Sequence, residues 1–157
     1  DHGRDPVSGD VLLGGRNSRL DNLQAAVLNY QFQFYDDVIK RRRDIAMIYN
    51  NRLCDIPYLF LPPKPDEHED YYDIYQNYEI EADNRDSLKD FLSQNGIGTL
   101  IQWGGKGVHQ FNKLGFDTSL PFSEKVFERM LLLPINMSIT DEDVNYVCDK
   151  IHSFYDL

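Results

Sequence analysis

The chain has 157 residues, which is enough for one domain with a hydrophobic core of its own. Hydrophobic residues make up 41% of it and charged residues 27%, both ordinary values for a globular protein. The formal net charge of -10 argues against general nucleic-acid binding, which needs a basic face, and we find neither a signal peptide nor an apolar run long enough for a membrane span.

The first 15 residues are predicted to form a loop, with a short apolar piece at 11–13 that could pair or pack. The glycine pair Gly14-Gly15 then leads through a polar turn into the longest helical pattern of the chain. The start of a helix presents unpaired N–H groups and the positive end of the helix dipole, so an anion is favoured there. Asn17 and the arginines beside it could bind that anion, or could merely cap the helix.

A long helix is predicted over residues 20–54, because apolar residues recur every three or four positions and neither glycine nor proline occurs from Arg16 to Ile56. It would be about 50 Å long, more than a domain of this size can cover. We therefore expect it to bend near Asp36-Asp37 or to lie against a partner. The basic run 40–43 has acidic neighbours and is interpreted as a solvated face with local ion pairs, in preference to a nucleic-acid patch.

The rest of the chain alternates short strands and helices. Strands are expected at 58–61, 72–82 and 97–103, with Ile74, Gln76, Tyr78 and Ile80 on one face of the second. Helices are expected at 88–94, 109–114 and 123–131, and after the N-cap Thr140, where Val144, Val147, Cys148 and Ile151 would form the buried stripe. This order predicts an α+β fold, in which helices cover one face of a small three-stranded antiparallel or mixed sheet.

Few residue patterns carry chemistry by themselves. The two cysteines, Cys54 and Cys148, have no metal-ligand spacing and are interpreted as buried reduced thiols of a cytosolic protein. His68 lies in an acidic run and is expected to be an exposed imidazole rather than a ligand. No P-loop, dinucleotide fingerprint, zinc spacing or nucleophile elbow occurs.

One glycine-rich segment could form part of a binding site. The backbone of 104–107 could hold a phosphate with Lys106 as counter-charge, although a plain glycine turn fits the same residues. Trp103 could stack on a ligand ring or could belong to a core or an interface. His109 could share a pocket wall with Lys106 or be structural. These residues do not make a complete catalytic set.

Four motifs, in order along the chain, resemble the DegT/DnrJ/EryC1/StrS sugar aminotransferases. Residues 15–26 are similar to the family's Gly-x-Asn-x-Arg-Leu-Asp-x-Leu-Gln-Ala-Ala, and residues 41–49 to its Arg-Arg-x-x-Ala-x-x-Tyr. Residues 85–99 resemble Arg-Asp-x-Leu followed by Gly-Ile-Gly-Thr, and residues 133–144 resemble the closing Leu-Pro and Thr-x-Glu-x-Val. The resemblance covers nearly the whole chain.

This resemblance implies the small C-terminal domain of a fold type I enzyme that uses pyridoxal 5'-phosphate (PLP). Residues 1–19 would be the interdomain loop and the cofactor-phosphate turn, and 20–157 the domain itself. The large domain, with the Schiff-base lysine and the other catalytic residues, would be absent, because no lysine here matches that position. The complete enzyme would be a cytoplasmic homodimer that transfers an amino group from an amino acid such as glutamate to a keto-sugar nucleotide, in pathways such as polysaccharide biosynthesis.

The resemblance also assigns candidate site residues. Asn17 matches the asparagine that reaches across the dimer interface to the PLP phosphate of the neighbouring subunit, and Arg19 matches an adjoining arginine with a structural or substrate-facing role. The segment that lines the sugar-nucleotide pocket corresponds to Gln102, Trp103, Lys106 and His109. The family commonly has Tyr where this chain has Arg16 and Ser18, and His-Tyr where it has Gln102-Trp103, which leaves the sugar open.

Two hypotheses follow for the isolated chain. It is a fragment of such an enzyme, inactive and without bound PLP, because it lacks the lysine that the chemistry needs. Alternatively, it is a non-catalytic interaction or dimerisation module that retains the fold of the domain.

Overall fold

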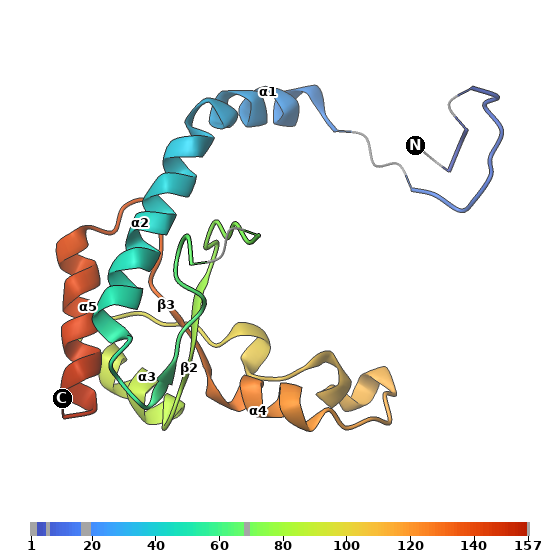
Figure 1. Ribbon diagram of the computed structural model, residues 1–157. Coiled ribbons are helices and arrows are strands. Elements are labelled where there is room, and N and C mark those ends of the chain that lie inside the picture. Colours follow the sequence, from blue (N-terminus) through green and yellow to red (C-terminus); the bar gives the residue numbers. More distant parts are fainter. Residues whose placement is uncertain (1–2, 6, 17–19, 68–69, 157) are drawn as a thin grey trace. The chain divides into compact units, whose positions relative to one another are not determined.

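The computed structural model describes residues 3–5, 7–16, 20–67 and 70–156 (Figure 1). The chain divides into two compact units, residues 1–37 and 38–157. The expectations for Asn17, Arg19 and His68 fall outside the described residues.

The long helical pattern of residues 20–54 forms three consecutive pieces. These are α1 (Asn22–Gln31), a 3-10 turn (Phe32–Phe34) and α2 (Tyr35–Leu53). The change in hydrogen bonding thus comes before Asp36-Asp37, where we expected a bend. Carboxylates in the first turn of α2 interact favourably with the helix dipole, so they support this helix start rather than interrupt the helix.

The sheet found in the described residues has three antiparallel strands in the order β1-β2-β3. The strands are β1 (Leu59–Phe60), β2 (Tyr78–Ala82) and β3 (Met130–Leu133). In register, Leu59 lies opposite Ala82, and Tyr78 lies opposite Leu133. The first two strands fall inside the predicted segments.

The prediction of a third strand at 97–103 is wrong. From that segment only Leu100 pairs, in an isolated bridge to Leu132, and a left-handed turn follows at Trp103. The third strand, β3, is instead the apolar run that the sequence analysis assigned to the end of a helix and the residues after it. All four residues of β3 are buried, so the run has no polar face whose period could tell a strand from a helix.

The second predicted strand begins six residues late. Tyr75 has a φ of 50°, and its N–H donates to Asp73 Oδ1 at 2.7 Å, so the chain turns before β2 begins. The turn buries the Tyr75 ring, whose hydroxyl donates to the Pro63 carbonyl at 2.7 Å. The expected alternation therefore holds only within β2, where Tyr78, Ile80 and Ala82 are buried.

In the described part of the chain three more α-helices follow: α3 (Arg85–Gln94), α4 (Pro121–Arg129) and α5 (Asp141–Phe154). The segment predicted as a helix at 109–114 is two short 3-10 turns, Val108–Gln110 and Asn112–Leu114. The capping prediction for α5 is confirmed, because Thr140 Oγ1 accepts from Asp143 N at 3.1 Å and Thr140 N donates to Asp143 Oδ2 at 3.0 Å.

The hydrophobic core lies where α2, α3 and α5 cover one face of the sheet (Figure 1). The predicted stripe on α5 is buried there, and the completely buried larger side chains include Ile45, Tyr49, Leu53, Tyr78, Ile80, Leu88, Leu92, Leu131 and Ile151. Cys148 is buried among them, but Cys54 is exposed, so the prediction of two buried thiols is wrong for Cys54.

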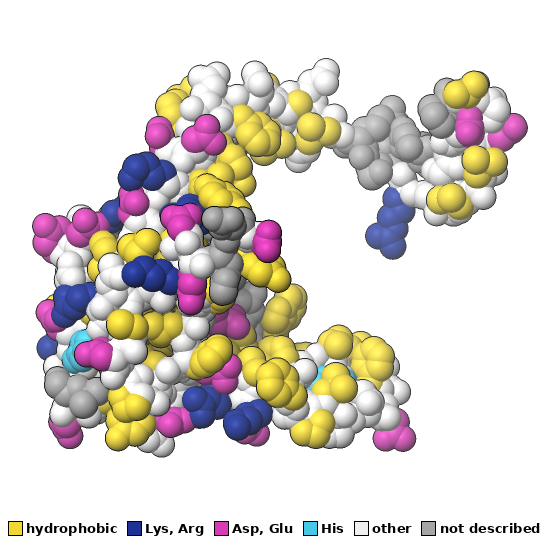
Figure 2. Space-filling view, viewed as in Figure 1, with side chains coloured by type: hydrophobic (Ala, Val, Ile, Leu, Met, Phe, Trp, Pro, Cys, Tyr) yellow, Lys and Arg dark blue, Asp and Glu magenta, His cyan; other side chains and the backbone are white. Residues whose placement is uncertain are grey.

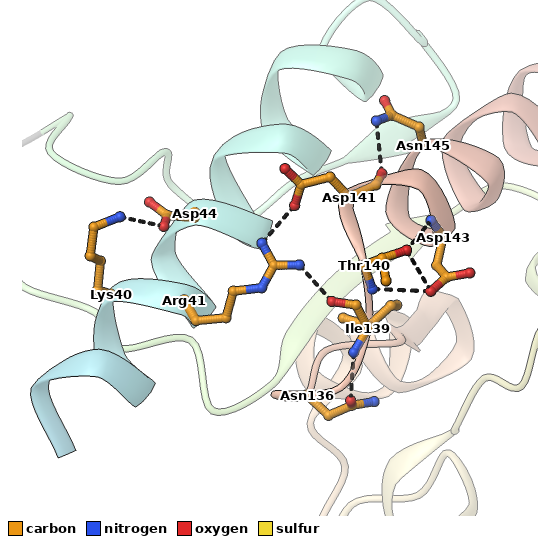
Figure 3. Close-up of polar contacts among 9 residues, drawn as sticks. All are labelled: Lys40, Arg41, Asp44, Asn136, Ile139, Thr140, Asp141, Asp143 and Asn145. Atoms are coloured by element: carbon orange, nitrogen blue, oxygen red, sulfur yellow. Dashed lines mark hydrogen bonds and ion pairs between the residues drawn. The ribbon is translucent and has the colours of Figure 1, made fainter. Parts of the chain in front are cut away.

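The basic run on α2 holds remote segments of the chain in place. Lys40 makes the expected local ion pair, with Asp44 at 2.6 Å. Arg41, in contrast, donates to Asp141 Oδ1 at 2.6 Å and to the Ile139 carbonyl at 2.5 Å, which fixes the start of α5 against α2 (Figure 3).

The next two arginines hold the segment before β2. Arg42 donates to the Tyr75 carbonyl at 3.0 Å. Arg43 donates to the Asp73 carbonyl at 2.6 Å, pairs with Asp66 and lies over the Tyr72 ring. The three arginine side chains are therefore engaged by the fold and do not form a basic patch.

Candidate ligand-binding loop

Three of the candidate substrate residues occur on one loop, residues 102–107, which we call the glycine loop. It begins with a 3-10 turn, Gln102–Gly104, closed by the N–H of Gly105 donating to the Gln102 carbonyl at 3.0 Å. Trp103, Gly104 and Gly105 have φ values of 53°, 66° and 71°. The left-handed region is ordinary for glycine but strained for tryptophan. A run of three such residues turns the chain away from the sheet edge at Leu100.

The loop presents two chemically different groups to solvent. Trp103 is 75% exposed, and Lys106 is exposed as well. Gln102 is half-buried, and its Oε1 accepts from Asn77 Nδ2 at 3.4 Å. An indole offers a ring for stacking and an ammonium group attracts an anion, so these side chains suit a ligand with both a ring and a phosphate.

His109 lies beneath the loop rather than on its exposed side. Only 6% of the side chain is accessible, and Nε2 lies 3.1 Å from Glu124 Oε1. The pKa of Glu124 lies below its usual value, chiefly because the Leu120 N–H donates to it and next because of His109. The ionised carboxylate is an acceptor only, so Nε2 of His109 carries the hydrogen.

Two glycines allow the loop to pack closely on its support. A Cβ at Gly107 would lie 2.6 Å from Cε1 and 2.8 Å from Nδ1 of His109, closer than any side chain permits. A Cβ at Gly105 would lie 3.2 Å from the Phe127 carbonyl oxygen of α4. The Gly107 N–H also donates to Gln110 Oε1 at 2.9 Å. The close contact with His109 therefore requires glycine at 107, whereas at 105 a Cβ would press on α4 and the positive φ favours glycine.

Exposed apolar side chains follow the loop along the two 3-10 turns and the start of α4, and Figure 2 shows hydrophobic side chains gathered over this part of the molecule. The exposed residues here are Val108, Phe111, Leu114, Phe116, Leu120 and Phe122.

The second candidate site lies at the start of the long helix. Helix α1 begins at Asn22, and Asp21 Oδ1 accepts from Leu23 N at 2.8 Å. The Asp21 carboxylate thus already occupies one N–H of this helix terminus. The candidate anion-binding side chains, Asn17 and Arg19, lie outside the described residues.

A complete PLP site includes a lysine that forms a Schiff base with the cofactor. All lysines of this chain lie in its described part, and none is buried. Lys40 is paired with Asp44, and Lys150 lies over the Tyr146 ring. A lysine that forms a Schiff base is activated by desolvation or by a neighbouring cation. The described residues therefore do not fit the lysine side of a PLP site.

Sequence reasoning singled out residues of the glycine loop but not the groups that support the loop. Glu124 and Asn77 were not singled out. An acidic residue in the first turn after Pro121 is a helix-start signal, which could have drawn attention to Glu124. Nothing in the spacing pairs Glu124 with a histidine 15 residues earlier.

In the described residues, no group of three or more His, Cys, Asp or Glu side chains could hold a metal ion. No helix in that part of the chain is both long and apolar enough to cross a membrane.

Comparison with known proteins gives a consistent result. The model of the DegT/DnrJ/EryC1/StrS aminotransferase family matches residues 2–152. The "Pleiotropic regulatory protein" of Geobacillus stearothermophilus is 35% identical over 157 residues, which are 98% of this chain and 42% of that protein. The "Erythromycin biosynthesis sensory transduction protein EryC1" of Saccharopolyspora erythraea is 33% identical over 137 residues, 85% of this chain and 36% of that protein.

Solved structures agree with these relatives. A DegT DnrJ EryC1 StrS aminotransferase from Brucella abortus matches 98% of this chain and 40% of its own, with a TM-score of 0.81 and 31% identity. DesV of S. venezuelae, solved in complex with a ketimine intermediate, matches 100% of this chain and 42% of its own, with a TM-score of 0.85 and 27% identity. The chain thus spans 42% or less of the length of each of these four proteins.

Proposed function

The chain belongs to the DegT/DnrJ/EryC1/StrS aminotransferase family, and on that premise we propose that it is the C-terminal part of a PLP-dependent nucleotide-sugar aminotransferase. The family match over residues 2–152 is the observation that carries this proposal. A relative from Aneurinibacillus thermoaerophilus, 28% identical over 148 residues, is a "dTDP-3-amino-3,6-dideoxy-alpha-D-galactopyranose transaminase". The proposed reaction moves an amino group from an amino acid such as glutamate to a keto-sugar nucleotide.

The chain would supply binding groups to the complete enzyme, and PLP, when bound there, supplies the electron sink for amino transfer. Trp103 would stack on the base of the nucleotide, and Lys106 would attract its phosphates. Gln102 and His109 would complete or support that wall of the pocket. Asn17 would contact the PLP phosphate of the neighbouring subunit in a homodimer, and Arg19 would lie beside it.

The isolated chain is expected to be inactive, because its described lysines are unburied and none matches the Schiff-base position. The test incubates the 157-residue chain with PLP, L-glutamate and a dTDP-keto-sugar, and measures amino-sugar nucleotide by mass spectrometry. We expect product only from a longer gene product that adds the rest of the family length. Turnover by the 157-residue chain would contradict its proposed inactivity, and a longer gene product without PLP binding would contradict the enzyme assignment.

A non-catalytic dimerisation module is the second candidate, favoured by apolar side chains exposed along the first unit. Leu23 is 76% exposed and Tyr30 is 63% exposed, and neighbouring Leu20, Val27 and Phe34 are exposed too. Light scattering on the isolated chain tests this candidate. A stable dimer that a Leu23→Glu substitution dissociates would support dimerisation through this face, and a monomer at all concentrations would exclude dimerisation as the role of the isolated chain.

A further inference from the structure

We propose that Glu124 is a positioning residue, which acts through the buried ring of His109 to hold the glycine loop in one arrangement. The loop would then present Trp103 and Lys106 to a ligand in a fixed relation. The nature of the ligand, a nucleoside diphosphate group, rests on the proposed function, but the positioning role does not. The interaction between Glu124 and His109 is called the latch below.

The carboxylate of Glu124 collects three hydrogen bonds on one oxygen. Oε1 lies 3.1 Å from His109 Nε2, 2.9 Å from Leu120 N and 3.3 Å from Ser119 Oγ. The bonds from Leu120 and Ser119 hold Oε1 at the start of α4. His109 therefore contacts a carboxylate whose position is fixed by the helix. A bond to an ionised acceptor is stronger than one between neutral groups.

The ring of His109 transmits this position to the loop by contact. Gly107 packs so closely on Cε1 and Nδ1 of His109 that a Cβ would overlap both atoms. Movement of the ring toward the loop would therefore displace the backbone of Gly107, next to Lys106. On the other side of the loop, Gly105 packs against the carbonyl of Phe127.

The helix that carries the latch is itself fixed to the rest of the fold. Arg85 Nη1 donates to the Phe127 carbonyl at 3.3 Å and to the Met130 carbonyl at 2.9 Å. Arg129 pairs with Asp83 at 2.5 Å. The end of α4 is thus bound to the segment between β2 and α3, and the latch extends that rigid body to the glycine loop.

The loop needs such a support because its backbone is strained. Tryptophan at a φ of 53° persists only where the surroundings determine the conformation. The indole provides little of that support, since Trp103 is 75% exposed. Strain of this kind is concentrated at binding and catalytic sites, where a fixed geometry is useful.

Trp103 is the single tryptophan of the chain, so its fluorescence reports on the loop alone. The experiment measures time-resolved anisotropy of Trp103 in the 157-residue chain. His109→Leu keeps the buried volume but removes the N–H, and His109→Gln keeps an N–H donor. Gly107→Ala leaves Glu124 and His109 unsubstituted, but its added Cβ would press on the His109 ring. Glu128→Gln, at an exposed position of the same helix, is the matched control.

We expect the amplitude of fast indole motion to rise about twofold or more in His109→Leu and in Gly107→Ala. His109→Gln should restore most of the wild-type value, and Glu128→Gln should not change it. Circular dichroism shows which variants are folded. If His109→Leu does not fold, Gly107→Ala decides the outcome. Wild-type anisotropy in the folded variants would overturn the positioning role.

A titration with thymidine diphosphate then separates the latch from the proposed function. Quenching of Trp103 in the wild type, with affinity about tenfold weaker in His109→Leu and preserved in His109→Gln, supports both. If the variants show larger indole motion but thymidine diphosphate quenches Trp103 in none of the proteins, the latch is supported and the ligand assignment is contradicted. Equal affinity in wild type and His109→Leu contradicts the positioning role.

Discussion

The two cysteines lie in opposite environments, and this difference decides their chemistry. Burial raises the pKa of Cys148 to about 12, and the nearby Arg52 guanidinium offsets only part of that effect. Because the thiolate is the reactive form, Cys148 is inert at neutral pH. Cys54 follows α2 and is exposed to solvent.

We therefore expect iodoacetamide to alkylate one thiol of the native chain quickly and the second only after unfolding. Mass spectrometry of the intact chain at pH 8 counts the adducts over time, and digestion locates them. Cys54→Ser is the control, and it should abolish the fast adduct. Fast labelling of Cys148 in the folded chain would contradict its buried position.

The residue identities that sequence reasoning assigned correctly are those whose partners are nearby in the chain. Thr140 was expected to cap α5, and Asp143, three residues later, completes that cap. Arg41 and Asp141, 100 residues apart, could not be paired from periodicity or spacing. The interaction between Glu124 and His109 could not be predicted for the same reason, since the segment containing His109 gives no indication of its partner on α4.

Helix ends provide a sharp test of backbone conformation in this fold. Gly96 follows α3 with a φ of 77°, and Gly98 has no positive φ. A Cβ at either position would meet nothing within 4 Å, so the two glycines differ in conformation and not in space. The left-handed region after a helix favours glycine because a Cβ is strained there.

Gly96→Ala should lower the free energy of unfolding by about 1 kcal/mol. Gly98→Ala, the matched control, should change it by less than about 0.5 kcal/mol. Urea denaturation followed by circular dichroism measures both values. Equal costs at the two positions would show that conformation is not the determining factor.

The cap of α5 also depends on charge. Hydrogen bonds from the backbone N–H and then the side chain of Thr140 lower the pKa of Asp143 below 3.8. A carboxyl group with a lowered pKa in the folded state stabilises the fold above its unfolded pKa, and this contribution is lost as the pH falls through the folded pKa.

Asp143→Asn should therefore be less stable than wild type at pH 7, and the difference should shrink below about pH 3.8. Urea midpoints from pH 7 to pH 3 give this profile. Asp90→Asn, on the exposed side of α3, is the matched control. A difference that grows on acidification would contradict the assigned cap.

At the element scale, sequence patterns located helices better than strands. The period of apolar residues identified α2 and α5, because each has one buried face. The run Met130–Leu133 has no exposed face, and the segment 97–103 has β-branched and aromatic residues but ends in left-handed turns. The third strand was expected at 97–103 rather than at 130–133 because residue propensity can be read from the sequence, whereas pairing with β2 cannot.

Over the whole chain, the core belongs to the second unit. Every residue of the core cluster lies between Ile45 and Ile151, and α1 contributes no buried residue. Residues 35–157 should therefore fold alone, with a free energy of unfolding within about 0.5 kcal/mol of the complete chain. Urea denaturation of both lengths compares them. A large loss on truncation would show that the first unit stabilises the second.

The contacts between α2 and α5 join two segments that the ribosome makes at different times. Arg41 and Asp141 are 100 residues apart, as are Arg52 and His152, and these contacts join the two helices. At about 5–20 residues per second, α2 emerges roughly 5 to 20 s before its partner helix. Its apolar face, with Ile45, Tyr49 and Leu53, lacks its α5 cover for that interval. Until α5 is made, the nascent chain therefore carries this apolar face without its cover, which favours aggregation.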